Sequence, residues 1–373
     1  MPAPFRLLRA RPAGYGRLVA GAGRRGRPLS RLTLGAPISV YPEADPLDDV
    51  RWADAHEEIA AAWLVDHLQG WFPRGVHGGA LADPHRILEP LSLLAAGAAT
   101  SRRVELGVAV TDPVRRSAVA LAQTASTVGW LGGRPMLLGL GVGDPGQLRP
   151  FGLHPGLERT GRLSYMRPAL AALDELRAGR ANAPLGVVEV SPFLLYVAAH
   201  GPRMLELTAA HADGWVPTSL APEAYRAGLD VLRGHAERAG RDPASVRPTL
   251  FVWTALASTR AESVALLRHP SVRAVALYRG RDGFARHGAT YPLPHSYIPN
   301  DVPPDRAASL AAAIPDAVVA DAVLHGSPED VRERLEAYRE AGCEHVICYD
   351  VGRFTDPEGT ARFREALLSV ARM

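Results

Sequence analysis

The sequence predicts a single α/β domain with eight strand–helix pairs, and two observations lead to this fold class. Short apolar or β-branched runs alternate with amphipathic segments along most of the chain, an order typical of parallel strands joined by helical crossovers. An open doubly wound sheet usually stops at about six strands, so eight pairs favour a closed sheet. With 373 residues and 47% hydrophobic content, the chain can bury the core that such a barrel needs. We therefore expect a (β/α)8 barrel, the TIM-barrel architecture.

The expected strands are short runs rich in valine, leucine and alanine, followed by turn-forming or polar residues. They are Leu32–Val40, Ala62–Asp66, Val104–Val110, Met136–Gly141, Phe193–Ala199, Gly214–Pro217, Thr249–Ala255 and His345–Tyr349. The segments between them have the apolar spacing of helices. The expected helices are Asp48–Ala60, Pro84–Ala99, Ala118–Leu131, Thr160–Ala178, Pro202–Ala212, Ala221–Ala239, Arg260–Leu267 and Glu358–Ala371.

Two regions fall outside this alternation. Residues 1–30 are rich in arginine, glycine and proline, which predicts a flexible tail before a single domain over residues 31–373. Residues 271–322 contain Tyr291-Pro-Leu-Pro and Pro303-Pro304 and are expected to form an insertion between strands seven and eight, over the barrel mouth. After it, Ser327 and Pro328 have the pattern of a helix N-cap and a first helical residue.

Composition limits the classes of function. The sequence contains no lysine, which excludes a Schiff-base or P-loop lysine and leaves guanidinium or backbone N–H groups to bind any phosphate. Cys343 and Cys348 flank an apolar run typical of a core strand, and we expect no metal site. No apolar stretch reaches the roughly 20 residues that cross a bilayer, and no leader pattern is visible. We expect a soluble, cytoplasmic protein that binds a small-molecule substrate, with no nucleic acid as a partner.

Polar residues that end the expected strands are the first candidates for chemistry, because reactive groups of such barrels lie at the carboxyl ends of the strands. Asp66 and His67 follow the second strand, and a histidine with an ordinary pKa of about 6.5 suits a general acid or base. The spacing fits equally well an Asp66 that caps a turn and a His67 that only packs. The run from Gly141 to Gly146 has the form of a dinucleotide fingerprint, but Pro145 is expected to keep the chain in a loop where that fingerprint opens a helix.

Several segments together resemble the bacterial luciferase-like superfamily, in the branch that uses the deazaflavin coenzyme F420. Asp66-His67-Leu68-Gln69-Gly70-Trp71 resembles the Asp-His-x-Gln-x-Trp motif of its glucose-6-phosphate dehydrogenases. The segments 106–110, 138–144 and 198–202 resemble its third strand, its Gly-x-Gly-Glu strand and its phosphate-side loop. The resemblance covers the chain from about Leu32 to its end.

The resemblance implies a set of site residues. Asp66 would contact the deazaflavin ring, His67 would transfer the proton at the substrate oxygen, and Trp71 would form a wall of the substrate pocket and stabilise developing charge. The Ala109–Val110 bond would be a non-proline cis peptide behind the ring. The other residues implied are Asp144 as a second acid and, as cofactor contacts, Gly143, His200, Gly201, Pro202 and Thr218. The family also implies a homodimer.

Departures from the family pattern narrow the expected substrate. The family's glutamate is Asp144 here, which leaves an acid role at this position less secure, and a substrate-binding lysine of the sugar-phosphate dehydrogenases falls at Ala221, which disfavours glucose-6-phosphate. The stretch 107–116 is closer to the phthiodiolone ketoreductases of the same branch. It ends in Arg115 and Arg116, which fit either a site for the cofactor's acidic tail or a solvated pair.

The expected function is therefore F420-dependent hydride transfer between the deazaflavin and a carbonyl or secondary alcohol. Two alternatives remain open. One is an FMN-dependent monooxygenase of the same superfamily, and the other is a non-catalytic flavin-binding barrel.

Overall fold

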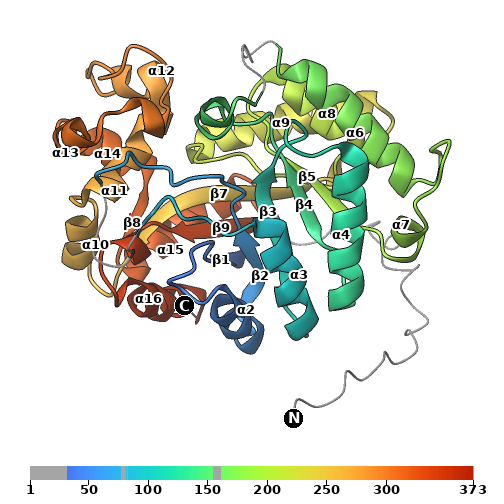
Figure 1. Ribbon diagram of the computed structural model, residues 1–373, viewed down its shortest axis with the longest axis horizontal. Helices are drawn as coiled ribbons and strands as arrows, with labels where there is room; N and C mark the ends of the chain where they lie inside the picture. Colours follow the sequence, from blue (N-terminus) through green and yellow to red (C-terminus); the bar gives the residue numbers. More distant parts are fainter. Residues whose placement is uncertain (1–31, 77–80, 82, 154–160, 373) are drawn as a thin grey trace.

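The computed structural model describes residues 32–76, 81, 83–153 and 161–372, so the expected tail lies outside the described residues. Parallel strands form a closed ring at the centre of the molecule (Figure 1). In ring order they are β1 (Thr33–Pro37), β2 (Ile59–Leu64), β3 (Glu105–Thr111), β4 (Leu137–Leu140), β5 (Leu194–Val197), β6 (Gly214–Trp215), β7 (Arg247–Leu256) and β9 (His345–Asp350), and β9 pairs with β1. The expected TIM barrel is confirmed.

A ninth strand, β8 (Leu324–Gly326), was not predicted and does not belong to the ring. Because β6 has only two residues, it pairs with β7 only at Arg247 and Pro248. The rest of that edge of β7 needs other partners for its backbone groups. Thr254 pairs with Asp350 of β9 on one side and with Leu324 on the other. Strand β8 therefore completes the β7 edge that the short β6 leaves open.

Helices surround the barrel, and their bounds differ from the expected ones mainly at the carboxyl end of α2 and the amino end of α3. The larger helices are α2 (Pro46–Ala55), α3 (Pro90–Thr100), α4 (Ala118–Gly132), α6 (Leu163–Arg177), α8 (Pro202–His211), α9 (Pro222–Arg238), α15 (Pro328–Glu340) and α16 (Gly359–Arg372). Short helices α5 (Pro145–Leu148), α7 (Gly186–Val190) and α10 (Arg260–Leu266) lie between them. Proline is the first residue of five of the larger helices, where its missing N–H costs nothing. The expected cap at Ser327 is confirmed, as part of a capping box with Asp330.

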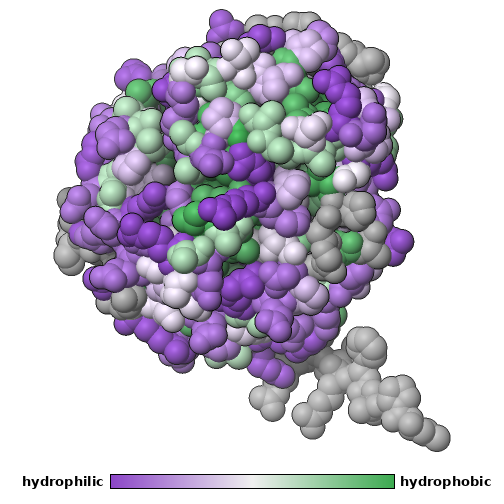
Figure 2. Space-filling view, turned by 90° about the vertical axis from the view of Figure 1, so that its left-hand side faces the viewer, coloured by the Kyte–Doolittle hydropathy of each residue, from purple (hydrophilic) through white to green (hydrophobic). Residues whose placement is uncertain are grey.

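The expected insertion is also confirmed and is largely helical. It comprises α11 (Pro270–Arg273), α12 (Gly280–Ala285), α13 (Pro304–Ala312) and α14 (Asp316–Ala322). These helices form one group on the left of Figure 1, beside the end of β8. The face seen from that side is mostly hydrophilic, with hydrophobic residues in small areas between the polar ones (Figure 2). The insertion therefore has a solvated outer surface and packs its apolar side chains on the barrel.

Polar side chains close the amino-terminal end of the barrel. The buried His345 ring accepts a hydrogen bond from Trp63 Nε1 at its Nε2 (3.0 Å), and its Nδ1 lies 2.8 Å from the Thr33 hydroxyl. Burial, with a smaller effect from Arg247, lowers the pKa of His345 well below its ordinary value, so the ring is neutral. With this end filled, the carboxyl ends of the strands are the place for a site. None of the described helices is both long and apolar enough to cross a bilayer.

Candidate active site

Asp66 lies two residues beyond β2, in a buried ionic cluster. Its side chain is only 1% exposed, and its two oxygens lie 3.0 Å from Arg115 Nη1 and 2.5 Å from Arg116 Nη1. Each arginine has a second carboxylate, Asp112 for Arg115 (2.6 Å) and Glu89 for Arg116 (2.6 Å). The two arginines are thus not a solvated pair. They hold the carboxyl end of β2 in place, and Arg115 Nη2 also donates to the Asp66 carbonyl (2.8 Å).

His67 follows directly and is the group at this strand end without a protein partner. The residue is partly exposed, and no described residue forms a hydrogen bond with its ring. Burial, with a smaller effect from Arg115, lowers the pKa of His67 to about 4, although Asp66 acts in the opposite direction. The imidazole is therefore neutral at pH 7. It can accept a proton at one nitrogen or donate a hydrogen bond from the other.

Asp144 lies at the end of β4, where it caps the one-turn helix α5 through Gly146 N (2.9 Å). The expectation that Pro145 keeps this segment in a loop was wrong, since Pro145 is the first residue of α5. Burial raises the pKa of Asp144, against the hydrogen bond from Gly146 and the charges of Arg162 and Arg115. A carboxyl group with a raised pKa is suited to hold a proton.

Two glutamines connect the loop after β2, which carries His67, to the loop after β4, which carries Asp144. Gln147 Oε1 accepts from Leu68 N (2.7 Å) and Gln69 N (3.1 Å), while Gln147 Nε2 donates to the Gln69 carbonyl (3.2 Å). In return, Gln69 Nε2 donates to the Gly146 carbonyl (2.6 Å). Both side chains are buried. Four hydrogen bonds therefore fix the two loops relative to one another, and the sequence analysis missed Gln147.

The expected cis peptide bond is present between Ala109 and Val110 in β3. It falls where the pairing of β3 with β4 shifts, between Val108 and Thr111. A Cβ atom on Gly139 would lie 2.8 Å from Val110 Cγ1. One on Gly141 would lie 2.7 Å from Val110 Cγ2. Glycines in β4 therefore make room for the Val110 side chain, which explains a run that also resembles a dinucleotide fingerprint.

The next glycine of the run, Gly143, has a φ of 80°, a left-handed conformation that glycine adopts without a steric penalty. Its carbonyl accepts a hydrogen bond from Arg162 Nη1 (3.0 Å). A Cβ atom at Gly143 would also lie 2.7 Å from Leu148 Cδ1. Gly143 therefore presents backbone without a side chain after β4, and its conformation is fixed by the Arg162 hydrogen bond.

The expected phosphate side of the site lies beyond β5 and β6. Thr218 N donates to His200 Nε2 (3.3 Å), so these two predicted residues are in contact. Gly201 caps α8 with no side-chain hydrogen bond, and both Gly201 and Pro202 are exposed. A helix amino end without a side-chain cap favours a bound anion.

Trp71, which the resemblance predicts to form a wall of the substrate pocket, is fully buried. Its indole N–H donates to the Ser271 carbonyl (3.3 Å), and its own carbonyl accepts from the Tyr297 hydroxyl (2.8 Å). Both partners belong to the insertion. The Trp71 ring also contacts Trp253 and Phe354, with centroid distances of 5.5 and 4.8 Å. The insertion thus covers Trp71 and ties itself to the loop after His67.

The insertion also contributes Tyr278, which the sequence analysis missed. This ring is 36% exposed and packs edge-on against Tyr297 at 5.1 Å. The Asp144 charge raises the pKa of both tyrosines, after the larger effect of burial. The insertion reaches the end of β4, because a Cβ atom on Gly146 would lie 3.2 Å from Pro299 Cδ. No group of three His, Cys, Asp or Glu side chains in the described part of the chain is arranged to hold a metal ion.

Comparisons with known proteins identify the family. The profile described as luciferase-like monooxygenase matches residues 35–345. The chain belongs to the luciferase-like monooxygenase family. This luciferase-like protein is 30% identical over 316 residues to the phthiodiolone/phenolphthiodiolone dimycocerosates ketoreductase of Mycobacterium kansasii, which is 76% of this chain and 85% of that protein.

Two solved structures share its fold. An F420-dependent secondary alcohol dehydrogenase in complex with an F420–acetone adduct has a TM-score of 0.69 and 17% identity, over 91% of this chain and 99% of that chain. The coenzyme F420-dependent tetrahydromethanopterin reductase from Methanopyrus kandleri has a TM-score of 0.67 and 14% identity, over 90% of this chain and all of that chain. At these identities the likeness shows the barrel fold of the luciferase-like protein.

Proposed function

We propose that this luciferase-like oxidoreductase transfers a hydride between coenzyme F420 and the carbonyl carbon of a ketone, or of the corresponding secondary alcohol. The observation that carries the proposal is the partly exposed His67, whose neutral ring has no described hydrogen-bond partner. The relative that is 30% identical is named a ketoreductase, and a structure of the same fold is named an F420-dependent secondary alcohol dehydrogenase. Both names support hydride transfer at a carbonyl carbon.

The residues at the barrel mouth fit a flat ring that carries a phosphate arm. Gly141 and Gly143 present backbone without a side chain beyond β4, where Gly141 lies next to Val110 and Gly143 next to Leu148. The amino end of α8 has no side-chain cap, and the partial positive charge of this helix end favours a phosphate. In this proposal the ring lies against Asp66, Ala109, Val110 and Gly143, and the arm lies against His200, Gly201, Pro202 and Thr218. Asp66 already accepts from two arginines, so it would also act by holding His67 in place.

When bound, the deazaflavin would donate or accept the hydride. His67 would act on the proton. In alcohol oxidation the neutral imidazole accepts the hydroxyl proton, and in ketone reduction the protonated ring returns it to the carbonyl oxygen. A negative charge of the bound cofactor or substrate near His67 would raise the pKa of His67 from about 4 towards neutrality, where proton transfer is most effective. Asp144, whose pKa is raised by burial, is the candidate second proton carrier.

Two measurements test the proposal. The dissociation constants of coenzyme F420 and of FMN are measured separately, and turnover of a ketone is followed anaerobically through the deazaflavin absorbance. His67→Ala is expected to lower turnover by about 100-fold or more, because proton transfer contributes about that much, and to leave cofactor binding unchanged. His235→Ala, on the outer helix α9, is the matched control. Unchanged turnover in His67→Ala would refute the role of His67, and tight binding of FMN alone would refute the cofactor.

An FMN-dependent monooxygenase is the second candidate, favoured by the description of the matching family. It would consume oxygen on addition of substrate, whereas the proposed reaction proceeds without oxygen. A non-catalytic flavin-binding barrel would bind the cofactor without any turnover. We further propose a homodimer, as the family resemblance implies, and sedimentation velocity would report its mass.

A further inference from the structure

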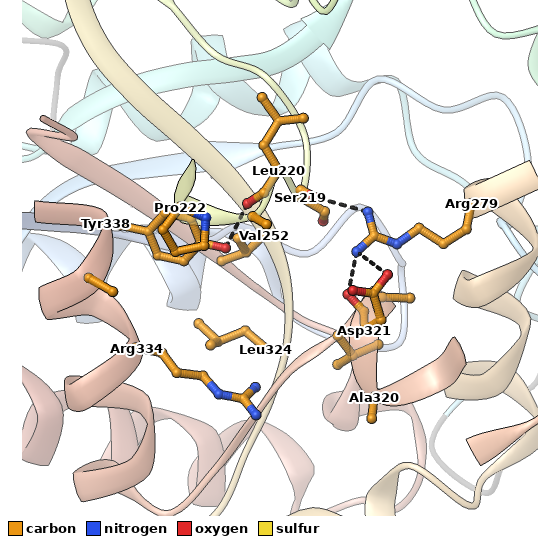
Figure 3. Close-up of a pocket in the computed structure, with 14 residues that line it drawn as sticks. Ser219, Leu220, Pro222, Val252, Arg279, Ala320, Asp321, Leu324, Arg334 and Tyr338 are labelled. Carbon is orange, nitrogen blue, oxygen red and sulfur yellow. Dashed lines mark hydrogen bonds and ion pairs between the residues drawn. The ribbon is translucent and has the colours of Figure 1, made fainter. Parts of the chain in front are cut away.

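A pocket of about 340 Å³ lies outside the proposed active site. It is enclosed by the loop after β6, the middle of β7, the end of α14 with β8, and α15 (Figure 3). Neither His67 nor Asp144 lines it. Its size is in the range of small-molecule sites, which begin at roughly 300 Å³. The polar groups that line it determine what it could hold.

The wall formed by the insertion carries the guanidinium group of Arg279 beside the carboxylate of Asp321. Arg279 donates to the Ser219 carbonyl (2.7 Å) and lies 3.0 Å from Asp321. Asp321 is shared, because Arg286 Nη2 also lies 3.4 Å from the same carboxylate oxygen. One carboxylate therefore serves two guanidinium groups. The Nε of Arg279 is buried and has no partner among the described residues.

The opposite wall carries a second guanidinium group. Arg334 of α15 lines the pocket and is exposed. Figure 3 shows its guanidinium group among the lining residues, with no interaction to any of them. No described residue forms a hydrogen bond or an ion pair with Arg334. Its charge is therefore available to a ligand.

Neutral donors complete the lining. The Ser219 hydroxyl is buried without a hydrogen-bond partner, on a backbone with a φ of 48°, a conformation uncommon for residues other than glycine. Helix α9 begins at the pocket, and its cap residue Ala221 has no side-chain oxygen to accept the first N–H groups. A helix of this length carries a partial positive charge at its amino end. Two arginines, a hydroxyl and a helix end thus face one space.

We propose that this pocket binds an oxyanion, the carboxylate or phosphate group of a small organic molecule. Guanidinium groups and helix N–H groups are the donors that recognise such groups in proteins, and the volume leaves room for more than a bare ion. The source of the oxyanion is either a separate metabolite or the acidic tail of the proposed cofactor. The second source is within reach, because the lining residue Ser219 directly follows Thr218, whose N donates to His200 Nε2 (3.3 Å) on the phosphate side of the active site. The binding of a free oxyanion does not depend on the proposed function.

Citrate and inorganic phosphate are the probes, titrated by calorimetry into the full chain at constant ionic strength. Arg334→Gln removes an exposed side chain with no described partner, so its fold is expected to be unchanged. It should weaken binding of the tighter probe by about tenfold, which corresponds to about 1.4 kcal/mol. Arg334→Glu should abolish binding. Arg238→Gln, an exposed arginine at the far end of α9, removes the same charge and should leave binding unchanged.

Competition between citrate and the cofactor distinguishes the two sources of the oxyanion. If citrate weakens binding of tailed coenzyme F420 but not of its tail-less chromophore, the pocket takes the cofactor tail. If citrate and the tailed cofactor bind together, the pocket takes a separate molecule. Absence of binding of both probes at about 10 mM, or equal binding by the native protein and Arg334→Glu, would overturn the proposal. These outcomes do not require turnover, so they are distinct from failure of the proposed reaction.

Discussion

Replacing Gln147 with alanine should loosen the active site from within. Three hydrogen bonds are lost, from Leu68 N (2.7 Å), from Gln69 N (3.1 Å) and to the Gln69 carbonyl (3.2 Å). A buried hydrogen bond contributes about 1 kcal/mol, so the free energy of unfolding should fall by about 3 kcal/mol. The loss belongs at the upper end of the range for such bonds, because alanine leaves two buried N–H groups without an acceptor.

The assay combines a global and a local measurement. Urea unfolding reports the free energy of unfolding, and hydrogen exchange reports the opening of the Leu68 and Gln69 amides. Because the same loop carries His67, kcat should also fall. Gln123→Ala, an exposed position on α4, is the matched control and should change none of these quantities. A loss of unfolding free energy below about 0.5 kcal/mol, the range of an ordinary surface substitution, together with unchanged exchange, would refute the reasoning.

Three further predictions follow from burial and packing. Burial lowers the pKa of His67 to about 4, so as the pH falls the unfolded chain takes up this proton first, at about pH 6.5, and the folded protein loses stability between about pH 6.5 and 4. His67→Gln should lose less stability over this pH range, and equal acid sensitivity of the two proteins would contradict the prediction. Burial raises the pKa of Asp350 to about 7, so the folded state binds this proton more tightly than the unfolded chain, and the resulting stability is lost as the pH rises from about 4 to above 7. Asp350→Asn should lose less unfolding free energy than the native protein between pH 5 and pH 8. An equal loss in both proteins would contradict the prediction. Gly139→Ala places a Cβ atom against the Val108 carbonyl, so it should lower the free energy of unfolding by about 1–3 kcal/mol and lower the melting temperature. Gly186→Ala, whose Cβ atom would meet no atom within 4 Å, should leave the melting temperature unchanged, and equal melting temperatures of the two variants would exclude the clash.

The barrel was predictable because each of its strands is a compact apolar run, but boundaries failed where the composition is uniform. The run Ile59-Ala60-Ala61-Ala62 was divided between a helix and a strand in the prediction, whereas all four residues belong to β2. Alanine fits both elements, so no local preference marks the change. The real turn lies at residues 56–58, between α2 and β2.

Pro303 and Pro304 were interpreted as an interruption in the insertion. In the structure Pro303 is the cap of α13 and Pro304 is its first residue. Strand β8 was missed because three residues carry no periodicity, and because it forms only where the short β6 leaves an edge of β7 unpaired. That requirement arises from the whole sheet rather than from local sequence.

The positions of the site residues followed from the strand ends, but their partners did not. His67 and Asp144 lie at the ends of β2 and β4 as expected, yet the sequence has no signal that Gln147 joins them. In the same way, Arg115 and Arg116 could be placed after β3, but not paired with Asp66. Such pairs depend on side-chain directions across the barrel mouth, which spacing along one strand does not determine.

The position of β8 has a consequence for how this protein could diversify. The segment 257–323, which contains α10 and the insertion, leaves the barrel after Leu256. Strand β8 holds the two ends of this segment together through its ladder with β7 and a hydrogen bond from Ala257 N to the Gly326 carbonyl (3.4 Å). Closing a loop that is twice as long costs only about 0.6 kcal/mol more. The segment between these ends can therefore be replaced by a shorter or longer one, in evolution or by protein engineering. Such a replacement would change the cover of the active site and leave the register of the barrel strands unchanged.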